Sequence, residues 1–282
     1  LFTQGMVCHE TYKDQNNNWI SPEEIELIEN VYYKKGDSSS KIIVGPSESM
    51  SKSKKNVIDP ENIMDNYGAD AVRLFILSDS PPEKDVQWSE QGMVASYKFL
   101  HKLWILHNKV KEKIENNLRI DESNNELNKF TNQMIFKITN NLESFNYNVI
   151  IANIYEIYNF LIKETEKKLD SENLKINYKK ILILFSPAIP HFVAECLDDL
   201  KIKDEMDWPN SDKKYLKEDT IDFVVQINGK KRAILKENRD IDQETLLNKV
   251  KSNNISNKYL KNKSINKVIF VKNRLINLIV ND

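Results

Sequence analysis

Apolar residues recur every three or four positions through most of residues 89–200, which is the spacing of one face of an α-helix. The pattern falls into four stretches with short polar connections, and Pro187 and Pro190 interrupt the fourth because proline removes a helical hydrogen bond. Four long amphipathic helices are typical of a helical bundle, which we predict for residues 89–212. The periodic positions are Met93, Tyr97, Leu100, Leu103, Trp104, His107, Val110 and Ile114; Leu127, Phe130, Met134, Ile138 and Leu142; Ile150, Ile151, Ile154, Ile157, Tyr158 and Leu161; and Tyr178, Ile181, Leu182, Phe185, Phe192, Val193, Cys196 and Leu197.

The spacing of the apolar residues changes after residue 219. Residues 223–227 read as a strand, Asn228-Gly229 is a strong two-residue hairpin signal, and residues 230–235 read as the returning strand. A helix is expected near 242–251, and 267–271 and 275–280 read as a second hairpin. We therefore predict a small β-β-α-β-β module, an α+β domain, over residues 219–282.

Residues 1–88 show no single long period. Turn-rich polar tracts at 14–18 and 36–40 separate short candidate strands such as 41–44, and residues 47–56 read as a polar loop. We interpret this segment as the end of an α/β region, so the fold class is multidomain: α/β, then all-α, then α+β.

Two short helices are expected after that loop. Asp59 can cap the first, whose opening turn holds Pro60 and which should end near Gly68. Asp70 can cap the second, at residues 71–77, and Ser80-Pro81-Pro82 then breaks the chain.

The charge is unevenly distributed along the 282 residues, a length that favours about two domains. The net charge is −1, with 29% charged and 40% apolar residues, as in an ordinary globular protein. Residues 220–282, however, hold 13 Lys and Arg against 6 Asp and Glu, which leaves residues 1–219 acidic. The basic tail suits contacts with a nucleic-acid backbone, although a solvated lysine-rich face is the simpler alternative.

Glycine, cysteine and long apolar runs are all scarce. The six glycines are too scattered to form a glycine-rich phosphate loop, so any phosphate chemistry must use side chains. Cys8 and Cys196 form no paired framework, and no apolar run is long enough to span a membrane, so we expect a cytoplasmic protein without a membrane partner. Because the chain opens with Leu1 inside an apolar stretch, we expect it to begin within a longer protein.

The polar loop holds Met50-Ser51-Lys52-Ser53. A lysine ammonium is a point charge on a flexible stem that can grip phosphate oxygens, and small serines add hydroxyl donors. From the residues alone, a solvated basic linker remains the alternative.

A longer stretch of sequence around this loop resembles that of a known protein family. The stretch 49–60, followed by 67–75, resembles the KMSKS region of class I aminoacyl-tRNA synthetases. Several further stretches are similar to the bacterial leucyl-tRNA synthetase family, so that the resemblance covers essentially the whole chain. They are residues 1–7, 82–89, 99–104, 186–191, 208–209 and 225–232.

The resemblance implies the C-terminal part of such an enzyme. Residues 1–88 would end a Rossmann-type catalytic domain with the KMSKS-type loop at 49–53, residues 89–212 would form an anticodon-binding-type bundle, and 219–282 would bind tRNA. Ser49 stands where the family has its first motif lysine, and neither the HIGH motif nor an editing domain occurs. Isoleucyl enzymes commonly end in a cysteine-rich zinc module and valyl enzymes in a coiled coil, neither of which fits this tail. Other class I synthetases (valyl, isoleucyl, methionyl) and a tRNA-binding module without catalysis, alone or as a split subunit, stay as alternatives.

The family's chemistry gives the loop residues expected roles. Such enzymes activate leucine with ATP as substrate, with Mg²⁺ expected, and transfer the leucyl group to tRNA(Leu). Lys52 is the expected catalytic residue, and Met50, Ser51 and Ser53 complete the ATP-binding loop. No metal site is visible in the sequence.

Further basic residues are candidates for tRNA binding. Arg73 lies on an otherwise apolar helix, and a structural salt bridge is its alternative role. The other candidates lie in the basic module: Lys230, Lys231, Arg232, Lys267 and Arg274. Trp88 and Trp104 are expected to pack in the core, with stacking on nucleotides as the alternative; His107 is expected to pack in the core, and His191 to cap or pack.

Overall fold

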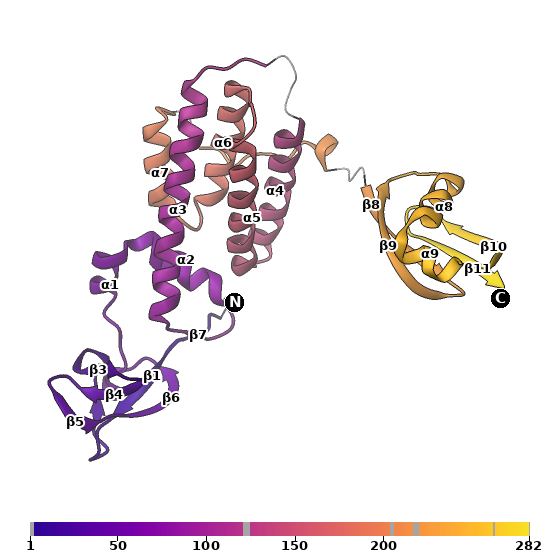
Figure 1. Cartoon of the computed structure of the whole chain (residues 1–282). Helices are drawn as coiled ribbons and strands as arrows, with labels where there is room; N and C mark the ends of the chain where they lie inside the picture. Colours follow the sequence, from indigo (N-terminus) through magenta and orange to yellow (C-terminus); the bar gives the residue numbers. More distant parts are fainter. Residues whose placement is uncertain (1–2, 121–124, 204–205, 217–219, 262, 282) are drawn as a thin grey trace. The chain divides into compact units, whose positions relative to one another are not determined.

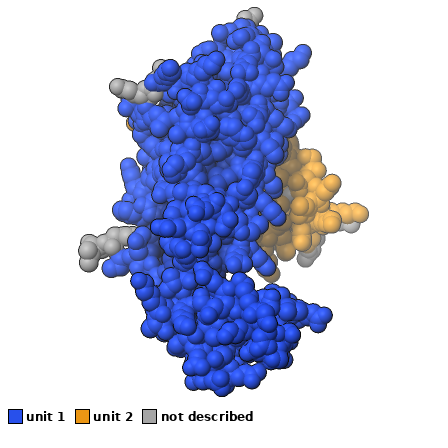
Figure 2. Space-filling model, turned by 90° about the vertical axis from the view of Figure 1, so that its left-hand side faces the viewer, with its two compact units in different colours: residues 1–212 blue, residues 213–282 orange. Residues whose placement is uncertain are grey.

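The computed structural model describes residues 3–120, 125–203, 206–216, 220–261 and 263–281. It divides into two compact units, residues 1–212 and residues 213–282, coloured separately in Figure 2. The boundary expected between residues 88 and 89 falls inside the first unit. Leu1 and the expected start of the small module at residue 219 lie outside the described residues.

The N-terminal strands form two small sheets (Figure 1). In the first, β1 (Val7–Lys13) lies between β2 (Trp19–Ile20) and β6 (Ile43–Ser49), antiparallel to both, and also pairs in parallel with β7 (Val86–Gln87). The second sheet, which the sequence pattern did not predict, is an antiparallel meander. Its strands are β3 (Ile25–Ile28), β4 (Val31–Lys34) and β5 (Asp37–Lys41).

The prediction of a loop throughout 47–56 is wrong for its first residues, since β6 continues to Ser49. Gly45 and Pro46 are poor strand formers, but pairing with β1 overrides their propensity. The register shifts opposite Glu10 and Thr11, so Pro46 falls at a bulge, where its missing N–H costs no ladder bond.

Two short helices follow as expected, α1 (Pro60–Tyr67) and α2 (Ala69–Asp79). The Asp59 side chain caps α1, and Gly68 separates the helices with a positive φ of 80°. The predicted cap of α2 by Asp70 is wrong. Gly68 occupies that position without a side-chain cap, and the Asp70 carboxylate is used elsewhere.

The bundle is confirmed, with the interrupted last stretch divided into two helices (Figure 1). Its core is continuous, and Trp104 packs against it as expected. No helix among the described residues is both long and apolar enough to cross a membrane. The helices are α3 (Glu90–Glu115), α4 (Asn125–Glu143), α5 (Tyr147–Thr165), α6 (Ser171–Phe185) and α7 (Pro190–Asp199).

Side chains of helix α2 form hydrogen bonds with the main chain between α6 and α7. The Asp70 carboxylate accepts hydrogen bonds from the main-chain N–H of Phe192 at 2.7 Å and of His191 at 3.4 Å, so it caps α7. Arg73 donates from Nε and Nη2 to the carbonyls of Ala188 and Pro187, at 3.1 and 2.7 Å. The segment that follows the polar loop is thereby fixed to the bundle.

The C-terminal unit is a four-stranded sheet with two helices. The strand order is β10-β11-β8-β9, with β11 parallel to β8 and the other neighbours antiparallel. The two predicted hairpins and the first helix are confirmed, and a second helix, α9, was missed. Their bounds are β8 (Thr220–Ile227), β9 (Lys230–Asn238), α8 (Gln243–Ser252), α9 (Asn254–Leu260), β10 (Ser264–Val271) and β11 (Leu275–Asn281).

Candidate functional site

The loop with the candidate chemistry leaves the sheet at the paired ends of β1 and β6. Cys8 pairs with Ser49, and the main-chain N–H of Met50 donates to the Val7 carbonyl at 3.2 Å. Met50 is half-buried. The loop therefore starts from a hydrogen-bonded strand end.

The loop closes as one turn of 3-10 helix, Lys52–Lys54. The Ser51 hydroxyl oxygen caps this turn by accepting from the Lys54 N–H at 3.3 Å, and it lies 3.1 Å from the Ser53 hydroxyl. Lys55 ends the turn in the left-handed conformation, with φ 54°. Both motif serines thus shape the loop through their hydroxyl groups.

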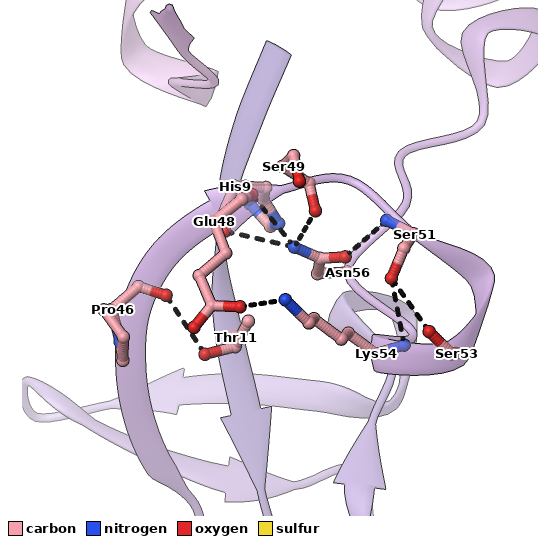
Figure 3. Close-up of polar contacts among 9 residues, drawn as sticks. All are labelled: His9, Thr11, Pro46, Glu48, Ser49, Ser51, Ser53, Lys54 and Asn56. Carbon is pink, nitrogen blue, oxygen red and sulfur yellow. Dashed lines mark hydrogen bonds and ion pairs between the residues drawn. The ribbon is translucent and has the colours of Figure 1, made fainter. Parts of the chain in front are cut away.

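Asn56 fastens the loop to the sheet (Figure 3). Its side chain is 0% exposed. Its Oδ1 accepts from the Ser51 N–H at 2.8 Å, and its Nδ2 faces the carbonyls of His9 and Glu48 at 3.3 and 3.2 Å. One buried amide therefore joins both strands to the loop.

The two lysines of the turn differ in their surroundings. Lys54 forms an ion pair with Glu48, back across the loop (Figure 3). Lys52 is exposed, and no partner of its ammonium group occurs among the described residues. Since the charge of Lys54 is already balanced, Lys52 is the one of these two lysines that can take an external anion. Lys55, which follows the turn, is exposed as well.

A cavity of about 600 Å³ lies beside the loop and is lined by His9, Glu10, Ser47, Ile58 and Trp88 among others. Burial lowers the pKa of His9, and the Nδ1 atom of this buried imidazole has no hydrogen-bond partner in the described part of the chain. The neutral ring therefore lines one wall of the cavity. In the same described residues, no group of three or more His, Cys, Asp and Glu could hold a metal ion.

The sequence pattern placed Met50, Ser51, Lys52 and Ser53 together but missed Asn56 and the Glu48–Lys54 pair. Asn56 ends a tract of polar residues, and nothing in such a tract marks one amide as buried. The ion pair joins two residues six positions apart, and this spacing predicts no contact until the loop is known to fold back.

Arg73, a candidate for tRNA binding, makes its hydrogen bonds to the bundle and not to the loop. Its guanidinium binds main-chain carbonyls at the α6–α7 corner rather than a carboxylate, and its side chain remains exposed. Arg73 therefore has a structural role, but through hydrogen bonds to carbonyls and not through the salt bridge that was the alternative. Its contact with RNA stays a proposal.

The basic candidates of the C-terminal unit do not gather on one face. Lys231 pairs with Gln226 and Lys267 with Ile279, which places both on the sheet face opposite the buried core. Arg232, at the β8–β9 bulge, instead stacks on Tyr259 of α9, with its guanidinium carbon 4.2 Å from the ring centre. Lys230 and Arg274 are exposed beside the two hairpin turns.

Two family models match the chain. Residues 10–89 match the family "tRNA synthetases class I (I, L, M and V)", and residues 124–247 match "Anticodon-binding domain of tRNA ligase". The sheet with its loop and much of the helical bundle are therefore similar to the corresponding parts of class I tRNA synthetases.

The curated relatives that match nearly all of this chain include leucine–tRNA ligases. The chain is 36% identical to the leucine–tRNA ligase of Rickettsia typhi and 35% identical to that of Parvibaculum lavamentivorans, over 99% of this chain and 34% of each relative. The resemblance to leucine–tRNA ligases is thus confirmed. The chain spans about one third of the length of these relatives, which fits the expected C-terminal part.

A solved structure supports the same conclusion. The crystal structure of the ternary complex of Agrobacterium radiobacter agnB2 LeuRS, tRNA and LeuAMS matches with a TM-score of 0.68 and 25% identity, over 83% of this chain and 32% of that one. The fold described above is therefore one found in leucyl-tRNA synthetases.

Proposed function

We propose that this chain supplies the ATP loop and tRNA-binding portions of a cytoplasmic leucine–tRNA ligase. Leucine–tRNA ligases of similar sequence over 99% of the chain support the choice of leucine over valine, isoleucine or methionine. The observation that carries the ATP role is the difference between the lysines: Lys54 is neutralised by Glu48, whereas Lys52 is exposed and available.

The loop would act on the leaving group. In the proposed reaction the leucine carboxylate attacks the α-phosphate of ATP, pyrophosphate leaves, and the leucyl group passes to the tRNA 3′ end. Lys52 would bind the pyrophosphate end of ATP, where a positive charge held in place stabilises the negative charge that develops as the bond breaks. Ser51 and Ser53 would hold the turn, and Met50 would anchor it to the strand end.

Mg²⁺ accompanies ATP in the family, but these loop residues do not fit as its ligands. The carboxylate beside the loop, that of Glu48 near the end of β6, is paired with Lys54. Mg²⁺ would therefore have to be held by ATP phosphates or by groups beyond those described, and the proposed role of Lys52 does not depend on it.

The tRNA contacts would come mainly from the C-terminal unit. Its excess of lysine and arginine suits contacts with RNA phosphates, which are largely independent of sequence. Because the candidate residues lie on two faces and two turns, they would follow a backbone rather than form one compact site. Arg73 would add a contact from the first unit through its exposed guanidinium edge.

The test is leucine-dependent exchange of pyrophosphate into ATP. The chain is assayed joined to the N-terminal two thirds of the Rickettsia typhi relative, with leucine, isoleucine, valine and methionine in turn. Exchange with leucine alone is expected. Exchange driven by another of these amino acids would contradict the assignment, and tRNA binding without any exchange would favour a tRNA-binding module.

A further inference from the structure

The position of the free lysine depends on a residue outside the four loop residues. The ammonium group of Lys52 has no partner among the described residues, and its main-chain carbonyl accepts from the Lys55 N–H at 3.3 Å within the same short turn, so neither contact ties Lys52 to the sheet. The Ser51 N–H, one residue earlier, is fixed by the Asn56 side chain at 2.8 Å. The Ser51 hydroxyl in turn caps the helical turn that Lys52 begins.

The site uses both ends of the Asn56 amide. Its oxygen accepts from the Ser51 N–H, while its NH₂ group donates to the carbonyls of His9 and Glu48. Asparagine carries both, whereas aspartate has only acceptors and would repel the two carbonyl oxygens. Because Asn56 is 0% exposed, water cannot easily replace the lost bonds.

We propose that Asn56 is a positioning residue for adenylate formation. It holds the loop on the ends of β1 and β6, so that Lys52 meets the pyrophosphate end of ATP (Figure 3). This role rests on the proposed function of Lys52. Asn56 itself touches no reacting atom.

The catalytic test is a double-mutant cycle of Lys52→Ala and Asn56→Ala, measured by leucine-dependent pyrophosphate exchange in the joined protein described above. Asn56→Ala alone is expected to lower kcat roughly 5- to 100-fold, with the KM for leucine unchanged. If Asn56 acts by placing Lys52, adding Asn56→Ala to Lys52→Ala lowers kcat further by less than about 2-fold. A double variant slowed by the full product of the two single effects would overturn the proposal, because a general loss of stability is independent of Lys52.

A second readout does not depend on catalysis. In the 282-residue chain, the Ser51 and Lys54 amide protons are expected to exchange with solvent at least about 10-fold faster in Asn56→Ala. Asn66→Ala is the control, since Asn66 is exposed on α1 and its Nδ2 donates to the Asn62 carbonyl one turn earlier in the same helix. Unchanged exchange at Ser51 in Asn56→Ala would refute the positioning role.

The two readouts separate the possible failures. If Lys52→Ala exchanges pyrophosphate at the wild-type rate, the proposed role of Lys52 is wrong, and the Ser51 amide still decides whether Asn56 holds the loop. If Asn56→Ala does not fold, Asn56→Asp takes its place. It keeps the acceptor for Ser51 but loses both donors, so it should also lower kcat, and an Asn56→Asp protein with wild-type kcat would overturn the proposal.

Discussion

Replacing Asp70 by alanine should weaken the link between α2 and the bundle. The carboxylate is 8% exposed and accepts from the Phe192 N–H at 2.7 Å and from the His191 N–H at 3.4 Å. Loss of this cap leaves the part-buried Phe192 N–H without its charged partner, which costs about 1–3 kcal/mol. The 2.9 Å contact with His191 Nδ1 adds little, because that side chain is 74% exposed and solvent screens the pair. We expect the free energy of unfolding to fall by about 1–3 kcal/mol.

Tryptophan fluorescence during urea unfolding provides the assay. All four tryptophans lie in residues 1–212, so the signal reports on the first unit alone. Asp65→Ala is the matched control, since Asp65 is exposed on the neighbouring α1. A loss of less than about 0.5 kcal/mol in Asp70→Ala, equal to that of the control, would refute the capping argument.

Three further outcomes are expected. Burial lowers the pKa of His107, whose Nε2 bonds Asp199, so the unfolded chain binds more protons below about pH 6.5. Stability of the first unit should therefore fall as the pH drops from 7 to 5, by at most about 1.4 kcal/mol per pH unit, and a flat profile by urea unfolding would contradict this. Gly5→Ala should lower the same unfolding free energy by at least about 1–3 kcal/mol, because a Cβ there would meet the Lys84 carbonyl oxygen at 2.0 Å; a wild-type urea midpoint would refute it. Removing residues 220–282 should weaken tRNA binding without changing leucine activation, and unchanged tRNA affinity at low salt would exclude the tail as a binding surface. Lys231→Ala or Lys267→Ala should each reduce the slope of log K for tRNA binding against log salt by about 1.

Long periodic segments were predictable from the sequence because their patterns are local. The bundle helices carry apolar positions over several turns, and most of the periodic positions named for α5 and α6 are buried. In α3 the periodic positions Met93, Leu103, His107 and Val110 are buried, whereas Tyr97, Leu100, Trp104 and Ile114 are only partly buried. The Asn228-Gly229 hairpin was equally clear, since both residues adopt the positive φ that such a turn requires. Helix α9 was missed because its seven residues offer too few turns for a period to show.

The failures came where a distant partner decides the structure. Strand β6 forms through Gly45 and Pro46 because β1 lies beside it, which no local propensity reveals. Asp70 looked like the cap of its own helix, yet its carboxylate caps α7, more than a hundred residues later. In the site, the resemblance identified Lys52, but the burial of Asn56 and the pairing of Lys54 depend on how the loop folds back onto the sheet.

The central claim is that Lys52, rather than its neighbour Lys54, serves the phosphates of ATP. It is tested most directly by comparing Lys52→Ala with Lys54→Ala in leucine-dependent pyrophosphate exchange. Loss of one charge-assisted contact of about 1.5–3 kcal/mol predicts that Lys52→Ala is roughly 10- to 150-fold slower. Lys54→Ala should slow pyrophosphate exchange far less, because Lys54 is bound to Glu48 and its loss would act only by changing the shape of the loop. Near-wild-type exchange by Lys52→Ala, or an equal loss in both variants, would contradict the account.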